Sequence, residues 1–174
     1  KKKTAAYMGD ALDIHSVPVD LQVPAVSSGK PTAGRRVRVT APEYAGTDVH
    51  HVLYLPTDWV AGQTYPVLVE YAGNGPHRSK HGDVSSGHVE GSSLGYGISG
   101  GLGFLWLCLP FVDDTGTHNQ RQWWGSVKRT VDYCKTVVPR VCALYGGDPR
   151  AIVLLGFSRG AIACNYIGLY DDEI

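Results

Sequence analysis

The residues most suited to chemistry are five consecutive ones, Gly156-Phe157-Ser158-Arg159-Gly160, which fit the pattern G-x-S-x-G. They follow a short apolar run at 151–155 and precede a segment with helical character at 159–169. In that setting the pattern is typical of a sharp strand-to-helix turn that exposes a serine hydroxyl as a nucleophile. The two glycines remove side chains that would collide across such a turn. Ser158 is therefore our candidate nucleophile, and the simpler interpretation is a serine that only caps a helix.

The second half of the chain alternates between predicted strands and helices, and these elements must position the serine. Apolar runs at 104–110 and 151–155 predict buried strands, because both faces of each run are apolar. Apolar side chains at helical spacing predict a helix over 123–145, which Pro139 should kink or restart. Together with the helix at 159–169, this order predicts an α/β protein with a mostly parallel sheet.

The first half of the chain predicts strands without helices between them. Residues 1–34 contain three prolines and no clean period, which indicates an arm with at most a short strand. The segments 35–40, 51–56 and 65–71 have strand-like patterns and are joined by short turns, so we expect antiparallel edge strands. A Gly-rich loop should then extend over 77–103.

Composition limits the class of protein. The 174 residues include 16 Lys+Arg and 16 Asp+Glu, 43% are hydrophobic, and the formal net charge is zero. This favours one globular domain and argues against a nucleic-acid-binding protein, which should show a basic excess. No stretch approaches the roughly 18 apolar residues of a membrane span. The four cysteines lack metal-binding spacing, so we expect buried free thiols that leave the redox compartment open.

These features resemble the α/β-hydrolase superfamily, specifically esterase D, feruloyl esterases, polyester depolymerases and dienelactone hydrolases. The resemblance extends from about residue 52 to the end of the chain. It rests on Tyr54-Leu55-Pro56, on Tyr65-Pro66-Val67-Leu68-Val69 running into Gly73-Asn74-Gly75, and on Gly147-Asp148-Pro149-Arg150-Ala151-Ile152 leading into the serine motif. It implies an N-terminal arm at 1–34 and, over 35–174, the N-terminal portion of a single α/β-hydrolase domain. The sheet would be mostly parallel with antiparallel edge strands on its N-terminal side.

The resemblance also implies a function. Ser158 would attack a small or polymeric ester and form an acyl-enzyme, without a cofactor. The oxyanion would be held by the Arg159 N–H and by a second N–H from Gly73 or Asn74. Here the chain has Ala72-Gly73-Asn74, where family members often carry His-Gly. The alternatives are a serine peptidase of the same fold and a non-catalytic binding module that keeps the turn. The oligomeric state stays open.

The sequence departs from the family pattern after the serine. An acid and then a histidine should follow Ser158 in the chain, but the sixteen residues after it include no histidine. We therefore expect a longer chain that supplies the acid, the histidine and the last strands of the sheet. The lack of an N-terminal Met adds to this expectation. The alternative is a complete chain that is a pseudoenzyme or recruits another base.

If another base is used, it should come from loops at the carboxyl ends of the strands, where the active edge of such a sheet lies. His118 is the first candidate, because Asp113 and Asp114 nearby could orient its imidazole. His77 and His81 are weaker candidates.

Other polar and aromatic residues near this edge have weaker signals. His77, His81 and Asp83 have a vaguely metal-like spacing, but no further ligand is evident, and we predict no metal site. Trp123 is expected to form an aromatic wall of a substrate pocket, to which His118 would also contribute, whereas Trp124 should face the core. For Arg159, a cation at the pocket mouth and a merely solvent-exposed helix residue are both open.

Overall fold

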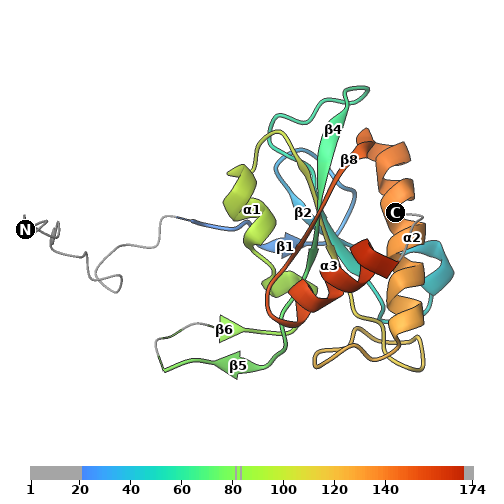
Figure 1. The fold of residues 1–174 in the computed structure, drawn as a ribbon. Coiled ribbons are helices and arrows are strands. Elements are labelled where there is room, and N and C mark those ends of the chain that lie inside the picture. Colours follow the sequence, from blue (N-terminus) through green and yellow to red (C-terminus); the bar gives the residue numbers. More distant parts are fainter. Residues whose placement is uncertain (1–20, 81, 83, 171–174) are drawn as a thin grey trace, which may run out of the picture.

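The computed structural model describes residues 21–80, 82 and 84–170, which form an α/β protein with a mixed, mostly parallel sheet (Figure 1). Its six strands lie in the order β1-β2-β3-β7-β4-β8. Their bounds, in that order, are Val26–Ser27, Arg36–Val39, His51–Tyr54, Leu105–Leu109, Tyr65–Tyr71 and Gly147–Gly156. The α/β class expected from the sequence is therefore confirmed.

Strand directions agree with the expectation only in part. β3 is antiparallel to both β2 and β7, as expected for the N-terminal side of the sheet. β4 is not an antiparallel edge strand, because it lies between β7 and β8 and is parallel to both. A parallel neighbour needs a long crossover, and the chain between β4 and β7 is long enough to provide one. The short strand β1, inside the predicted arm, pairs in parallel with β2; residues 1–20 lie outside the described residues.

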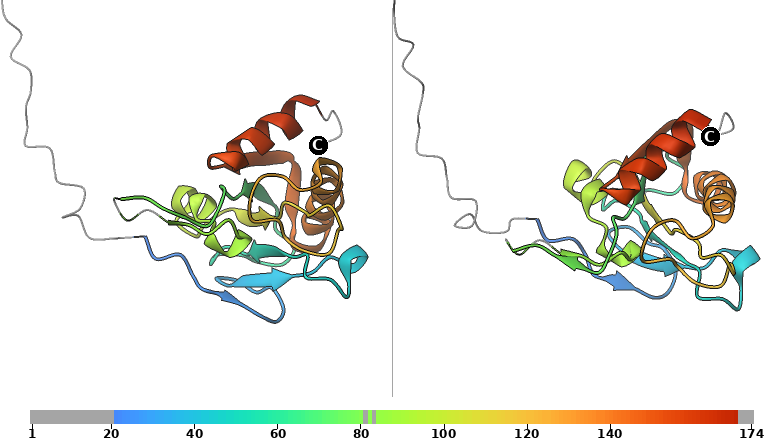
Figure 2. Two further views of the ribbon diagram at one scale, coloured as in Figure 1. Left: turned by 90° about the horizontal axis from the view of Figure 1, so that it is seen from below. Right: turned by 60° about the horizontal axis from the view of Figure 1, so that its bottom comes forward.

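The two faces of the sheet are covered by different helices. Along β7, Leu105, Leu107 and Leu109 belong to one buried cluster, whereas Trp106 and Cys108 belong to another. The first cluster includes side chains of α2 (Val127–Tyr145) and α3 (Arg159–Tyr170), which lie on the same side of the sheet (Figure 2). The helix α1 (Leu94–Ser99) packs against the second cluster.

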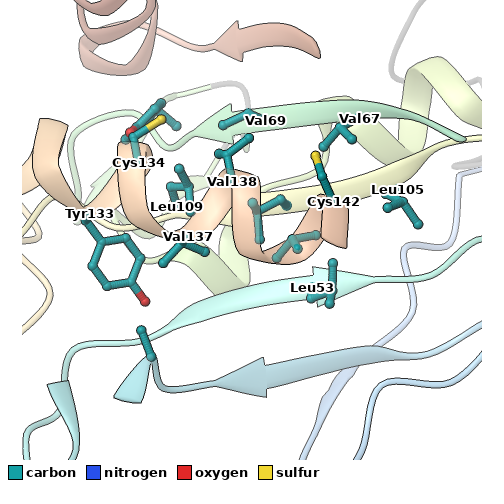
Figure 3. Close-up of a cluster of buried hydrophobic side chains, with 14 of the residues drawn as sticks. Leu53, Val67, Val69, Leu105, Leu109, Tyr133, Cys134, Val137, Val138 and Cys142 are labelled. Atoms are coloured by element: carbon teal, nitrogen blue, oxygen red, sulfur yellow. The ribbon is translucent and has the colours of Figure 1, made fainter. Parts of the chain in front are cut away.

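The first cluster forms the main core. Figure 3 shows Val137 and Val138 of α2 packed over side chains of the sheet, among them Val69 and Leu109. Cys108, Cys134 and Cys142 are buried and Cys164 is half-buried, and all four are free thiols, as expected. Helices in the described part of the chain are all too short or too polar to cross a lipid bilayer.

The expected Gly-rich loop at 77–103 contains short elements that the sequence pattern did not predict. They are β5 (His77–Arg78), β6 (Val84–Ser85), the 3-10 turn η2 (Val89–Gly91) and α1. The first two pair as an antiparallel hairpin. The start of α1 is held by Glu70 of β4, whose carboxylate accepts hydrogen bonds from the N–H groups of residues 93–95. This long-range contact explains why local patterning missed the helix.

The helix α2 also differs from the expectation. It begins at Val127 and not near residue 123, because Trp123 and Gly125 have left-handed backbones with φ of 52° and 61°. Ser126 caps it by accepting a hydrogen bond from the Arg129 N–H at 3.2 Å. It continues unbroken through Pro139. Buried side chains on both sides of Pro139 hold the helix in place there. A second 3-10 turn, η1 (Pro42–Tyr44), lies between β2 and β3.

Candidate active site

Ser158 lies in a tight turn between β8 and α3, at the carboxyl edge of the parallel strands. Its φ is 54°, a left-handed conformation that is costly for a residue with a side chain. The Phe157 carbonyl accepts the Gly160 N–H at 2.8 Å, and the Ser158 carbonyl accepts the Ala161 N–H at 3.0 Å. These bonds close the turn on its inner side, and Ser158 itself is exposed.

The two glycines of the motif are required by close backbone contacts. A Cβ on Gly160 would lie 1.9 Å from the Tyr71 carbonyl oxygen at the end of β4. A Cβ on Gly156 would lie 2.2 Å from the carbonyl carbon of Gly160. Neither position can hold a side chain unless the backbone moves. The two ends of the turn, Gly156 and Gly160, are therefore packed against each other, and Gly160 is also packed against β4. This packing keeps Ser158 in its strained conformation.

Ser158 borders a cavity of about 480 Å³. Its walls come from the loop after β4, the β5–β6 hairpin and the loop before α2, and they comprise Asn74, Gly75, Pro76, His77, Ser85, Gln122, Trp123, Phe157 and Ser158. A second cavity of about 440 Å³ adjoins it and shares the walls His77, Ser85 and Phe157. The combined space is large enough for an organic substrate of moderate size.

The backbone of Trp123 is held by two hydrogen bonds, whereas its side chain is largely exposed. Its N–H donates to the Asn74 Oδ1 at 2.7 Å, and its carbonyl accepts a hydrogen bond from the Arg159 guanidinium. The residue is 65% exposed at the cavity wall, whereas Trp124 packs edge-on against the core residue Phe111, with ring centroids 5.3 Å apart. Trp124 therefore faces the core as expected, and Trp123 borders a cavity whose use as a substrate pocket stays a prediction.

Arg159 occupies neither of the two positions considered from sequence. It is 1% exposed, and its guanidinium stacks on Phe111 with 4.0 Å between the Cζ atom and the ring centroid. Its five N–H donors all bond to backbone carbonyls, those of Ala72, Gly73, Gly87, Gln120 and Trp123. Burial lowers the pKa of Arg159 to about 10, so it still carries its charge at neutral pH.

The residues expected to supply the oxyanion N–H groups lie near Ser158, and their role stays a prediction. The Arg159 N–H opens α3, where N–H groups have no intrahelical partner and favour negative charge. The loop of Gly73 and Asn74 lies against the turn, since a Cβ on Gly73 would come within 2.8 Å of the Phe157 ring. The Gly75 N–H is already bonded to the Arg121 carbonyl at 3.1 Å, so it is not available as a donor.

The structure does not bring His118 to Ser158. His118 is not among the residues that border the serine cavity. Its side chain is 64% exposed, and its Nδ1 lies 2.7 Å from the Thr117 hydroxyl and 3.8 Å from an Asp113 carboxylate oxygen. An imidazole so exposed and so placed can act as a base for Ser158 only after the loop moves.

The other described histidines divide into buried and cavity-lining ones. His50 and His51 are buried, with ring nitrogens 2.7 Å from the Glu90 carboxylate and the Tyr133 hydroxyl respectively. His88 borders only the second cavity, whereas His77 borders both. Within the described residues, no hydrogen bond joins an imidazole to the Ser158 hydroxyl.

The described residues contain no group of three or more His, Cys, Asp or Glu side chains that could hold a metal ion. Of the weak metal pattern considered from sequence, His81 and Asp83 lie outside the described residues.

Sequence reasoning missed two contributions to this site. The Asn74 side chain fixes Trp123, and the Arg159 guanidinium joins three loops. Neither the left-handed backbone of Trp123 nor the burial of Arg159 has a local signal in the sequence, because both depend on contacts with distant loops. No protein-family model matches the sequence, and no curated protein matches it at a significant level.

Proposed function

We propose that this protein is a serine hydrolase of the α/β-hydrolase fold that cleaves carboxylic esters through an acyl-enzyme on Ser158. One observation carries the proposal: an exposed serine is held at a φ of 54° between a parallel strand and a helix, beside a cavity. Strained serines at such turns are a feature of nucleophiles, because a serine that only caps a helix has no need of a left-handed backbone.

The surroundings of Ser158 support the same reaction. Attack on an ester carbonyl creates a negative oxygen, which the Arg159 N–H and an N–H from Gly73 or Asn74 would stabilise. Each such donor contributes roughly 3–4 kcal/mol to lowering the barrier in related chemistry. Trp123 and Phe157 give the cavity an apolar wall for the acyl or alcohol part of the substrate.

The reaction needs a base to take the serine proton. The expectation that an acid and a histidine follow Ser158 in a longer chain stays a prediction. Within the described residues, His77 is the imidazole that shares the cavity with Ser158, so His77→Gln is the variant that tests a base from this part of the chain. We expect this variant to keep ester turnover within about threefold of the wild type, because the base comes from elsewhere.

The competing function is a non-catalytic binding module, and it is favoured by the lack of an imidazole on Ser158 within the described residues. The two functions differ in whether the serine is reactive. The full gene product should be labelled by a fluorophosphonate probe on Ser158, and Ser158→Ala should lose the label and at least about a thousandfold of the ester turnover. Unlabelled wild-type protein, or a label that survives the substitution, would contradict the hydrolase.

A further inference from the structure

Within the described residues, all hydrogen bonds of the Arg159 side chain go to backbone carbonyls. These carbonyls come from three loops that surround Ser158: residues 72–73 after β4, residue 87 before η2, and residues 120–123 before α2. The bonds to the carbonyls of Gly73 and Gln120 are 3.1 and 3.2 Å long. Because an arginine has five N–H donors and all five are used here, the guanidinium has none left for a substrate.

We propose that Arg159 is a positioning residue that sets the direction of the second oxyanion donor while its own backbone N–H supplies the first. This inference rests on the proposed hydrolase function. The Arg159 side chain would hold the second oxyanion N–H in a fixed position relative to the Arg159 backbone N–H.

The geometry of the peptide bond links the carbonyls that Arg159 holds to the direction of the neighbouring N–H groups. The peptides that join Ala72 to Gly73 and Gly73 to Asn74 are trans, so each N–H points opposite to its carbonyl. Arg159 holds both carbonyl oxygens, at 3.4 and 3.1 Å. The N–H groups of Gly73 and Asn74 are therefore turned away from the guanidinium. Asn74 borders the cavity of Ser158, and we infer that its N–H, turned away from the guanidinium, faces this cavity.

The same side chain also holds the aromatic wall. Its bond to the Trp123 carbonyl and the bond from the Trp123 N–H to Asn74 together keep Trp123 in its left-handed conformation. Arg159, Asn74 and Trp123 thus form a closed chain of contacts around the serine cavity. Displacement of the guanidinium would release the second oxyanion donor and Trp123 together.

The chemistry of the side chain explains why arginine is suited to this position. A lysine has three N–H donors on one nitrogen and cannot reach carbonyls spread over three loops, whereas the planar guanidinium can. No carboxylate is among the bonded partners of Arg159 within the described residues, so its charge is not cancelled.

The test compares Arg159→Lys with wild type in the full gene product, with Arg36→Lys as the matched control at the other buried arginine. The readouts are kcat and KM on p-nitrophenyl acetate and the inhibition constant of a methyl trifluoromethyl ketone, which forms a tetrahedral oxyanion on a reactive serine. We expect Arg159→Lys to lower kcat about a hundredfold and to weaken the ketone by a similar factor, while KM stays within about threefold. Arg36→Lys should change kcat less than about threefold per folded molecule.

These readouts separate positioning from a role in folding alone. A residue needed only for folding would reduce the amount of folded protein but would leave the kcat of each folded molecule and the ketone affinity unchanged. If Arg159→Lys does not fold, Phe111→Leu replaces it, because this change removes the aromatic support of the guanidinium and keeps its five donors. We expect about a fivefold lower kcat from Phe111→Leu at unchanged KM, and a kcat equal to wild type would overturn the proposal.

Two further outcomes are decisive. A folded Arg159→Lys protein with wild-type kcat, or one with raised KM and unchanged kcat, would overturn the positioning role and leave the hydrolase function intact. A wild-type protein that cleaves no ester and carries no label on Ser158 would contradict the hydrolase function. It would also contradict the role of Arg159, which depends on that function.

Discussion

The two buried arginines, Arg36 and Arg159, lie on opposite faces of the sheet and are held in related ways. Arg36 stacks on Trp106 at 4.5 Å and Arg159 stacks on Phe111 at 4.0 Å, measured from the Cζ atom to the ring centroid. Both donate hydrogen bonds to backbone carbonyls. Each therefore replaces its hydration shell with an aromatic face and peptide oxygens, which makes burial of the charge tolerable.

The surroundings of the two arginines differ in charge. Trp106, under Arg36, donates its Nε1–H to the buried carboxylate of Glu70 at 2.8 Å, so this face holds a cation and an anion close together. Among the residues that the structure describes, the Nε of Arg36 has no hydrogen-bond partner, whereas every N–H of Arg159 has one. Arg159 has carbonyls but no carboxylate among its bonded partners in the described part of the chain.

This difference indicates two uses of a buried arginine. At Arg36 the charges balance, and the result is a fixed contact between β2, β7 and the start of α1. At Arg159 peptide oxygens hold the guanidinium in place without cancelling its charge, and the residue directly follows the strained serine in the chain. Three predictions test this contrast, from the largest expected effect to the smallest.

The first prediction concerns the close contact that fixes the Arg159 end of α3. Gly160→Ala would place a Cβ 1.9 Å from the Tyr71 carbonyl oxygen, so the backbone must move. We expect a loss of at least about 3 kcal/mol in the free energy of unfolding, together with loss of the label on Ser158. The measurement is urea unfolding and fluorophosphonate labelling of the same samples.

Gly168 on the same helix provides the control. A Cβ there would meet its nearest atom, in the Leu154 side chain, at 3.9 Å, which is ordinary contact. Gly168→Ala should therefore raise the free energy of unfolding by about 0.5–1 kcal/mol, since alanine favours a helix over glycine. Equal stabilities for the two variants would mean that the turn at Gly160 is not tightly packed.

The second prediction concerns the balanced face. Glu70 accepts N–H groups on both carboxylate oxygens, from the start of α1 and from Trp106. In Glu70→Gln one oxygen becomes an NH2 group that faces donors, and the charge of Arg36 loses its nearest buried anion. We expect a cost of about 2–3 kcal/mol in unfolding free energy, measured by urea titration at pH 7. A variant as stable as wild type would show that the two charges do not depend on each other.

The third prediction concerns His51, a buried histidine that is uncharged in the folded protein at neutral pH. Burial lowers the pKa of His51 to about 3, and the neighbouring charges of His50 and Arg140 act in the same direction. The unfolded chain therefore binds a proton near pH 6.5 that the folded protein does not bind. This contribution to stability is complete above pH 6.5 and decreases by about 1.4 kcal/mol per pH unit as pH falls toward 3.

The variant His51→Gln should remove that slope and can keep a hydrogen bond to the Tyr133 hydroxyl, which lies 2.7 Å from the His51 Nδ1. Urea midpoints of the two proteins at pH 7, 6 and 5 give the measurement. We expect the urea midpoint of the variant to rise relative to that of the wild type as the pH falls from 7 to 5. Parallel curves would mean that His51 is protonated in the folded protein, as the two arginines are.

The sequence predicted the elements whose packing depends on local periodicity. The apolar run of β7 and the helical spacing of α2 were recognisable, since both faces of a buried strand and one face of a packed helix must be apolar. The expectation of a buried strand at 151–155 was wrong, because β8 extends over Gly147–Gly156 at the edge of the sheet and leaves Val153 46% exposed. The same approach failed at 77–103, where the elements are two to six residues long. Their position depends on contacts with distant residues, such as that of Glu70 with the start of α1.

Around the candidate site, the sequence by itself determined Ser158 and the two glycines of its motif. A left-handed serine in a turn with no space for side chains requires those residue types in that order, so the pattern is visible in five letters. The placement of Trp124 against the core was also predictable from the helical spacing that follows it.

Only the tertiary structure decided what Arg159 and His118 do. The carbonyls that bond to Arg159 come from residues 36 to 87 positions away in the chain, and no local pattern encodes such distances. The pairing of His118 with Asp113 was suggested by their proximity in sequence, but His118 is not among the residues that border the cavity of Ser158. Hydrogen bonds between loops form only when strands and helices have brought their ends together, so chemistry that depends on those bonds is fixed by the fold as a whole.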